Sequence, residues 1–261
     1  MKQTVLSNKQ SELLEKLIVA HGYIVTSENI HDQAKSLWSQ TQVKNIISKL
    51  TADGWLIRLK RGLYTISDLS NRGFLSLSPY VVANLLVAES YVSFESALSY
   101  YGMFDQLTDK VISISQTRYK TVQLNATEYS FVNIQEKWFF GWQEVVIDAQ
   151  TVRIATIEKA LIDMTQFHKS KYSVDMVIEK LRSHKDDINI EKLDDHLSRM
   201  STSTIKIFGV LYDLLGINSS RLYMLIKSKR GTDSMFAGDK KFNAKWRLYY
   251  DEYFDKYQSL E

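Results

Sequence analysis

The chain of 261 residues contains no cysteine, one proline and ten glycines. The lack of cysteine excludes disulfide bonds, thiolate catalysis and cysteine-ligated zinc, and it fits a reducing cytoplasm. Because Pro79 is the only proline, we expect helices to dominate. The N-terminus shows no signal-peptide pattern, and the densest apolar run, residues 80–88, is too short to span a bilayer. These absences predict a globular, cytoplasmic protein without a membrane partner.

Charge is unevenly distributed, although the net charge is only +3. Residues 1–75 contain ten basic and six acidic residues, whereas the other 186 residues contain 23 basic and 24 acidic ones. Within the second part, residues 219–248 hold eight basic and two acidic residues. Positive charge therefore gathers toward both ends of the chain, and the middle is acidic.

The first seventy residues show the pattern of one small domain. The apolar spacing predicts three short helices and a hairpin, over residues 9–21, 28–38, 40–50 and 53–66. Ser27 and Ser39 are the expected caps of the second and third helices. Gly62 can supply the left-handed residue that ends a three-residue loop, Lys60-Arg61-Gly62. This order predicts a winged helix-turn-helix over residues 1–70, with the third helix as reader and the hairpin as wing.

The third helix and the hairpin carry the candidate DNA-binding residues. The apolar positions of the third helix are expected to be buried, so the other positions form an exposed side. This side contains no acidic residue and consists of Thr41, Gln42, Lys44, Asn45, Ser48 and Lys49. Their amides and hydroxyls can bond to base edges. Arg58, Lys60 and Arg61 place cations in and at the tip of the hairpin, where they can neutralise phosphates. The pattern favours double-stranded DNA as partner; the alternatives are a solvated turn and a winged helix that binds protein.

A larger domain is expected over residues 76–261, after a loosely composed hinge near residues 70–79. Pro79 suits the start of one helix, and Ser93 suits the cap of another. Closely spaced β-prone runs predict an antiparallel sheet within residues 76–155: 111–115, 120–125, 127–134 and 144–155. From Thr156 the pattern is helical, and aromatic residues at helical spacing extend this expectation to residue 261. The predicted fold class is α+β.

A search for catalytic patterns finds none that is specific. There is no phosphate-binding glycine loop, and the five histidines lack metal-ligand spacing. Asp239-Lys240-Lys241 has the local order of a nuclease motif but follows Gly238 without a supporting strand. We therefore expect no enzyme activity, no metal and no cofactor.

The basic segment 219–248 has two interpretations. It can be a helix C-terminus that complements the helix dipole, followed by a solvated loop. It can also be a second anion-binding surface, for DNA or for an RNA-bearing partner.

Three motifs resemble the AbiEi family, the antitoxins of abortive-infection toxin–antitoxin operons. They are GWLIRLKRGLYTI, YVSFESALSYYG and TVRIATIEKALIDM, and the helix pair that ends in STSTIKIFGVLYDLLG also fits. The similarity extends over about residues 5 to 230, and the order of the motifs carries it. By position, the resemblance implies DNA contacts for six residues: Thr41, Gln42, Lys44, Asn45, Lys60 and Arg61. Glu158 and Asp163 match the family's acidic pair.

The resemblance implies two activities for the chain. The winged helix would repress the chain's own operon at a promoter with inverted repeats. The domain over 76–261 would counteract a nucleotidyltransferase-like toxin, directly or indirectly. Two alternatives remain: a stand-alone regulator whose second domain binds a ligand or protein, and an enzyme that acts on nucleic acid.

Overall fold

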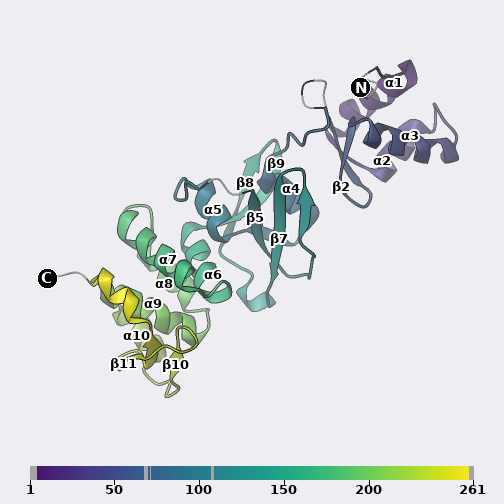
Figure 1. Cartoon of the computed structure of the whole chain (residues 1–261). Helices are drawn as coiled ribbons and strands as arrows, with labels where there is room; N and C mark the ends of the chain where they lie inside the picture. Colours follow the sequence, from purple (N-terminus) through teal and green to yellow (C-terminus); the bar gives the residue numbers. More distant parts are fainter. Residues whose placement is uncertain (1–4, 68–69, 71, 107–108, 259–261) are drawn as a thin grey trace. The chain divides into compact units, whose positions relative to one another are not determined.

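The computed structural model describes residues 5–67, 70, 72–106 and 109–258. The chain divides into two compact units (Figure 1). The first unit comprises Met1–Ala88 with Gln123–Thr127, and the second comprises Glu89–Val122 with Glu128–Glu261. Both contain helices and strands, so the α+β class is confirmed. The boundary between the units lies at Ala88, whereas the sequence places the hinge near residues 70–79, of which residue 71 lies outside the described residues. No helix in the described ranges is long and apolar enough to cross a membrane.

The first unit contains the expected three helices and the hairpin. Its elements are α1 (Asn8–His21), β1 (Ile24–Thr26), α2 (Ser27–Ala34), α3 (Gln40–Ala52), β2 (Leu56–Lys60), β3 (Leu63–Ile66) and α4 (Pro79–Leu86). The cap of α2 is Thr26 instead of Ser27, because the Thr26 hydroxyl accepts a hydrogen bond from Asn29 N at 3.1 Å. Ser39 caps α3 as expected.

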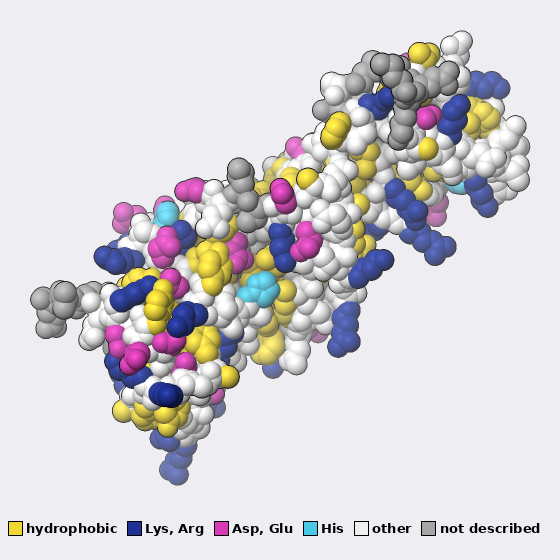
Figure 2. Space-filling view, in the orientation of Figure 1, with side chains coloured by type: hydrophobic (Ala, Val, Ile, Leu, Met, Phe, Trp, Pro, Cys, Tyr) yellow, Lys and Arg dark blue, Asp and Glu magenta, His cyan; other side chains and the backbone are white. Residues whose placement is uncertain are grey.

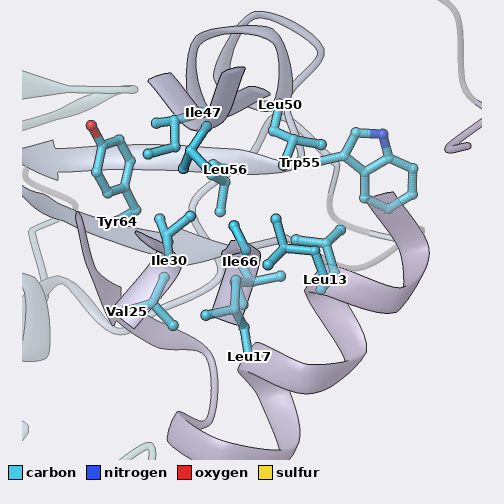
Figure 3. Packing of buried hydrophobic residues seen from close by; sticks show 13 residues of the cluster. Leu13, Leu17, Val25, Ile30, Ile47, Leu50, Trp55, Leu56, Tyr64 and Ile66 are labelled. Carbon is cyan, nitrogen blue, oxygen red and sulfur yellow. The ribbon is translucent and has the colours of Figure 1, made fainter. Parts of the chain in front are cut away.

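The core of the first unit lies between its helices and its small sheet (Figure 3). Antiparallel pairing gives the strand order β1-β3-β2. Apolar side chains from these helices and strands fill the space: Leu13, Leu17, Val25, Ile30, Ile47, Leu50, Leu56 and Ile66. The periodic apolar positions of α1 and α3 thus fix which side of each helix faces outward.

The hairpin is confirmed, but its loop is shorter than predicted. Lys60 pairs with Leu63, so Lys60 ends β2 and the turn consists of Arg61 and Gly62. An irregularity between Arg58 and Lys60 absorbs the extra residue. Gly62 has φ +79°, the left-handed conformation expected of it. Its carbonyl accepts a hydrogen bond from Ser27 N at 2.8 Å, which holds the turn against the start of α2.

The large sheet belongs mainly to the second unit and is mixed, so the prediction of an antiparallel sheet was wrong. Its strands are β4 (Ser90–Val92), β5 (Lys110–Ser115), β6 (Val122–Leu124), β7 (Thr127–Asn133), β8 (Trp142–Ile147) and β9 (Gln150–Ala155), in the order β6-β7-β5-β4-β9-β8. β5 runs parallel to β7, and β4 runs parallel to β9. The unforeseen strand β4 inserts between β5 and β9, which makes a simple up-and-down order impossible.

Helices α5 (Phe94–Tyr100) and α6 (Ile157–Phe167) pack on this sheet, and four more α-helices follow α6 within the described residues. α5 begins after Ser93, and a 3-10 turn, η1, spans Glu136–Trp138. The helical segments predicted after residue 156 are confirmed as far as residue 226: α6 (Ile157–Phe167), α7 (Lys171–Ser183), α8 (Ile190–Leu197), α9 (Thr202–Leu214) and α10 (Ser220–Ile226).

The prediction of a helical chain beyond α10 was wrong for the described residues, because a small sheet follows that helix; the last three residues of the prediction, 259–261, lie outside the described ranges. β10 (Asp233–Ser234), β11 (Lys241–Asn243) and β12 (Leu248–Tyr250) have the order β10-β12-β11, and the 3-10 helix η2 spans Glu252–Tyr257. Trp246, Leu248 and Tyr250 are buried, a period of two that the many aromatic residues of this segment conceal. The Trp246 ring lies against Gly209 of α9, where an added Cβ would come within 2.4 Å of it.

Candidate nucleic-acid interface and a buried polar cluster

The predicted exposed side of α3 is confirmed as a surface. Val43, Ile47 and Leu50 are buried, and the remaining polar positions face solvent: Thr41, Gln42, Lys44, Asn45, Ser48 and Lys49. α3 contains no acidic residue. Hydroxyl, amide and ammonium groups therefore lie on one side of a helix with no negative charge among them, a composition suited to base edges and phosphates.

The N-terminal residues of this surface are partly engaged in capping the helix. Gln42 Oε1 accepts hydrogen bonds from both the backbone N and the hydroxyl of Ser39, each at 3.0 Å. The Thr41 hydroxyl lies 3.3 Å from the Ser39 hydroxyl. Gln42 therefore keeps its amide NH₂ group as a donor, while its carbonyl oxygen is used within the capping box. The exposed side chains of Lys44 and Asn45 are available to a partner.

The three cations of the hairpin lie in different surroundings. Arg61 and Arg58 are exposed, and neither has an ion pair among the described residues. Lys60 is half-buried, and its Nζ donates to the Leu86 carbonyl oxygen at the end of α4, at 3.1 Å. The structure thus leaves Arg61 as the cation at the turn and gives Lys60 a hydrogen bond within the first unit.

A groove with a volume of about 360 Å³ runs between α2 and α3. Lys44 and Lys35 line it, together with Trp38 and Gln40. Lys35 forms an ion pair with Asp32 at 3.0 Å, so Lys44 is the cation of this groove without a carboxylate partner in the described chain. In the first unit, Lys44 and Lys49 on α3 and Arg58 and Arg61 in the hairpin are exposed cations.

A group of buried polar residues around Asp163 lies in the core of the second unit. Asp163 is fully buried on α6 and forms an ion pair with the equally buried Lys159 one turn earlier. Asp163 Oδ2 accepts hydrogen bonds from the Ser93 hydroxyl at 2.7 Å and from the Tyr91 hydroxyl at 3.2 Å. Lys159 Nζ also donates to the Tyr91 hydroxyl at 2.9 Å. We call these four residues the Asp163 cluster.

Burial controls the protonation of the Asp163 cluster. It lowers the pKa of Lys159 and raises the pKa of Asp163, while the attraction between the two opposes both shifts. Burial and the neighbouring carboxylate raise the pKa of Tyr91 well above its ordinary value. All these polar groups bond to one another, so the cluster joins β4 and the start of α5 to α6.

Glu158, the other acidic residue that the resemblance singles out, does not join Asp163. Its Oε1 accepts from Asn189 N at 3.1 Å, and its Oε2 lies 3.2 Å from Lys192 Nζ. It therefore holds the start of α8 near α6. In the described ranges no group of three or more His, Asp or Glu side chains is arranged to hold a metal ion.

Sequence reasoning did not single out Lys159 or Tyr91. Lys159 and Asp163 stand four residues apart in a helix whose other residues are mostly apolar. A Lys–Asp pair at this spacing inside a buried helix is the signal that could have identified the ion pair. Tyr91 gave no such signal, because its partners are about seventy residues away in sequence.

Comparisons with known proteins identify a likeness of fold. No protein-family model matches the chain, and no curated protein is detectably similar to it in sequence. The solved structure of the Rv2827c protein from Mycobacterium tuberculosis superposes with a TM-score of 0.66 and covers 95% of this chain and 93% of its own. At 14% identity this similarity concerns the fold alone. A shared fold does not define a function, which resides in the sites that the fold carries.

Proposed function

We propose that the first unit is a winged helix-turn-helix that binds double-stranded DNA. The observation that carries the proposal is the acid-free exposed side of α3, next in sequence to a hairpin with Arg61 at its turn. The element order α1-β1-α2-α3-β2-β3 and the strand order β1-β3-β2 support it, because a winged helix has a reading helix followed by a hairpin.

Each exposed residue has a distinct role in this proposal. Asn45 and Ser48 read base edges from the major groove, since an amide can form two hydrogen bonds with adenine. Lys44 and Arg61 neutralise phosphates on the flanking strands. Lys60 positions the end of α4 through the Leu86 carbonyl and is left out of the DNA contacts.

Binding to fragments from upstream of the chain's own reading frame tests this proposal. Asn45→Ala should cost roughly 1–3 kcal/mol on the preferred sequence and little on unrelated DNA, because it removes hydrogen bonds to a base. Asn8→Ala, an exposed asparagine on α1, is the matched control and should bind as the wild type does. If Asn45→Ala discriminates between preferred and unrelated fragments as well as the wild type does, α3 has no reading role at this position.

We further propose that the chain represses its own operon and counteracts a nucleotidyltransferase-like toxin through the second unit. The resemblance to AbiEi antitoxins motivates this assignment. Two of the motifs behind that resemblance, 91–102 and 151–164, meet in the Asp163 cluster, so their residues support the fold of this unit. A stand-alone regulator with a ligand-binding second unit is the alternative.

Separating the two activities in cells distinguishes these functions. The variant Lys44→Gln/Arg61→Gln should fail to repress the promoter and still rescue cells that express the neighbouring toxin gene. Its matched control is Lys9→Gln, an exposed cation on α1. If the double variant is folded and abundant but no longer rescues the cells, toxin neutralisation needs DNA binding. If neither the wild-type protein nor the double variant rescues the cells, the stand-alone regulator is favoured.

We propose no catalytic activity for the chain. Asp163 is enclosed by its own partners, and Asp239 accepts a hydrogen bond from Phe236 N at 2.6 Å. Metal-dependent cleavage or nucleotide transfer by the purified protein, abolished in Asp239→Asn, would contradict this proposal.

A further inference from the structure

The small C-terminal sheet has one covered face and one exposed face. Pairing of β11 with β12 places Asn243 opposite Leu248 and Phe242 opposite Tyr249. Leu248 is buried, whereas Phe242 is 46% exposed and Tyr249 is 38% exposed. Because neighbouring strand residues point to opposite faces, Phe242 and Tyr249 share the outer face. Their ring centroids are 4.9 Å apart, so they form a continuous aromatic surface facing solvent.

The segment that carries this aromatic pair also contains cations without carboxylate partners. Of the eight basic residues in 219–248, three form ion pairs: Arg221 with Asp195, Lys241 with Asp255, and Lys245 with Asp213. Five others are exposed and have no ion pair within the described part of the chain: Lys227, Lys229, Arg230, Lys240 and Arg247. Hydrophobic and basic side chains lie next to one another where β10 and β11 are found (Figure 2).

Several of these cations lie next to the strands that carry the aromatic pair. Lys240 directly precedes β11 and lies two residues before Phe242. Arg247 directly precedes β12 in a left-handed conformation, with φ +51°, and its carbonyl accepts a hydrogen bond from Asp233 N at 3.1 Å. The chain that leads into Asp233 carries Lys229 and Arg230.

The two acidic residues of the segment do not balance its unpaired cations. Asp233 pairs with Lys206 at 2.6 Å, whereas Asp239 accepts a hydrogen bond from Phe236 N and lines one pocket with Lys240. Five unpaired cations therefore stand against the single carboxylate of Asp239 within this described segment.

We infer that the outer face of the C-terminal sheet binds single-stranded nucleic acid. Phe242 and Tyr249 stack with unpaired bases, and Lys240, Arg247 and Arg230 follow the phosphates. Aromatic rings on an exposed sheet with cations beside them provide both parts of such a site, because every base has a face that can stack. A duplex hides its base faces, so the aromatic pair favours single strands over double-stranded DNA. This activity is independent of the duplex binding proposed for the first unit.

Fluorescence anisotropy with labelled oligouridylate RNA and oligothymidylate DNA of about 15 nucleotides tests the inference on the full chain. Wild-type protein should bind at least one of them, and Phe242→Ala/Tyr249→Ala should weaken binding by roughly tenfold or more. Lys240→Gln/Arg247→Gln should weaken binding and also reduce its salt dependence. Comparing RNA with DNA tells which kind of strand the surface prefers.

Two controls keep the result specific. Tyr172→Ala/Lys185→Gln removes an exposed aromatic residue and an exposed cation elsewhere in the second unit and should bind as the wild type does. Lys44→Gln/Arg61→Gln should also keep single-strand binding, since it alters only the first unit. Wild-type protein that binds neither oligonucleotide, or a folded Phe242→Ala/Tyr249→Ala variant of unchanged affinity, would overturn the inference. Loss of binding in Lys44→Gln/Arg61→Gln would overturn it as well, by assigning the strand to the first unit.

Discussion

The outer side of α3 and the Asp163 cluster are both sets of polar residues, yet their surroundings are opposite. Asn45, Lys44 and Ser48 face solvent, whereas Asp163 and Lys159 are fully buried and bond to one another. Exposed polar residues can bind a partner, and polar residues that satisfy one another inside a core specify the fold. The same residue types therefore support the proposed recognition in one unit and stabilise the fold in the other.

Removing one member of the Asp163 cluster should produce the largest effect. Lys159→Met leaves the Asp163 carboxylate buried without its counter-ion, which typically costs about 3–5 kcal/mol of unfolding free energy. Urea denaturation of the purified protein measures the loss. The matched variant Lys192→Met removes a lysine that is 43% exposed and pairs with Glu158, and it should cost far less.

A double variant sharpens this comparison between buried and exposed polar residues. Lys159→Met/Asp163→Leu removes both charges, so it should be less destabilised than the sum of the two single variants. Strict additivity of the single losses would mean that the two side chains do not act as a pair.

Gly209→Ala should have the next largest effect, through packing. The new Cβ would lie 2.4 Å from the Trp246 ring, so the ring and the C-terminal sheet must move. Overpacking of this kind costs roughly 1–3 kcal/mol. Thermal denaturation measures the loss of stability, and Trp fluorescence measures the change around the Trp246 ring. An unchanged midpoint of thermal denaturation would show that the sheet does not depend on this packing. Single-strand binding by the outer face should weaken in this variant as well.

The smallest expected effect is a pH dependence. Burial lowers the pKa of His168, whose ring stacks on Phe94 at 4.1 Å. The unfolded chain then binds a proton more readily than the folded chain, so stability is complete above the ordinary histidine pKa of about 6.5 and falls as pH decreases below it. The slope contributed by one proton is at most about 1.4 kcal/mol per pH unit.

Urea midpoints measured across this pH range reveal the effect. His168→Phe keeps a ring on Phe94 and removes the titrating group, so its midpoint should vary less with pH than that of the wild type. An identical pH profile in both proteins would assign the acid sensitivity to other groups.

The fold was predictable where local signals agree. Apolar periodicity identifies α1 and α3 almost to their ends, and Ser39 was recognised as the cap of α3, because short-range packing and capping decide those boundaries. β4 was missed, since a strand of three residues directly before a capped helix has too little pattern of its own. The C-terminal sheet was missed because its aromatic residues fit both a helical and an alternating period.

In the sites too, local features could be predicted and contacts between distant residues could not. The exposed side of α3 could be predicted because its apolar positions mark the buried side. The hydrogen bond of Lys60 with the Leu86 carbonyl could not, because it joins residues 26 positions apart and depends on tertiary packing. Likewise, Asp163 could be selected from the sequence, but its burial against Ser93 and Tyr91 follows from the position of β4 in the mixed sheet.

The salt dependence of duplex binding by Arg61→Gln is the sharpest test of DNA binding by the first unit. Arg61 is exposed at the hairpin turn, so its replacement should leave the circular dichroism spectrum unchanged. Binding to every duplex should weaken, and the slope of log K against log salt should decrease by about one for each phosphate that the protein no longer neutralises. Affinity and slope equal to those of the wild type at every salt concentration would contradict the proposed DNA binding.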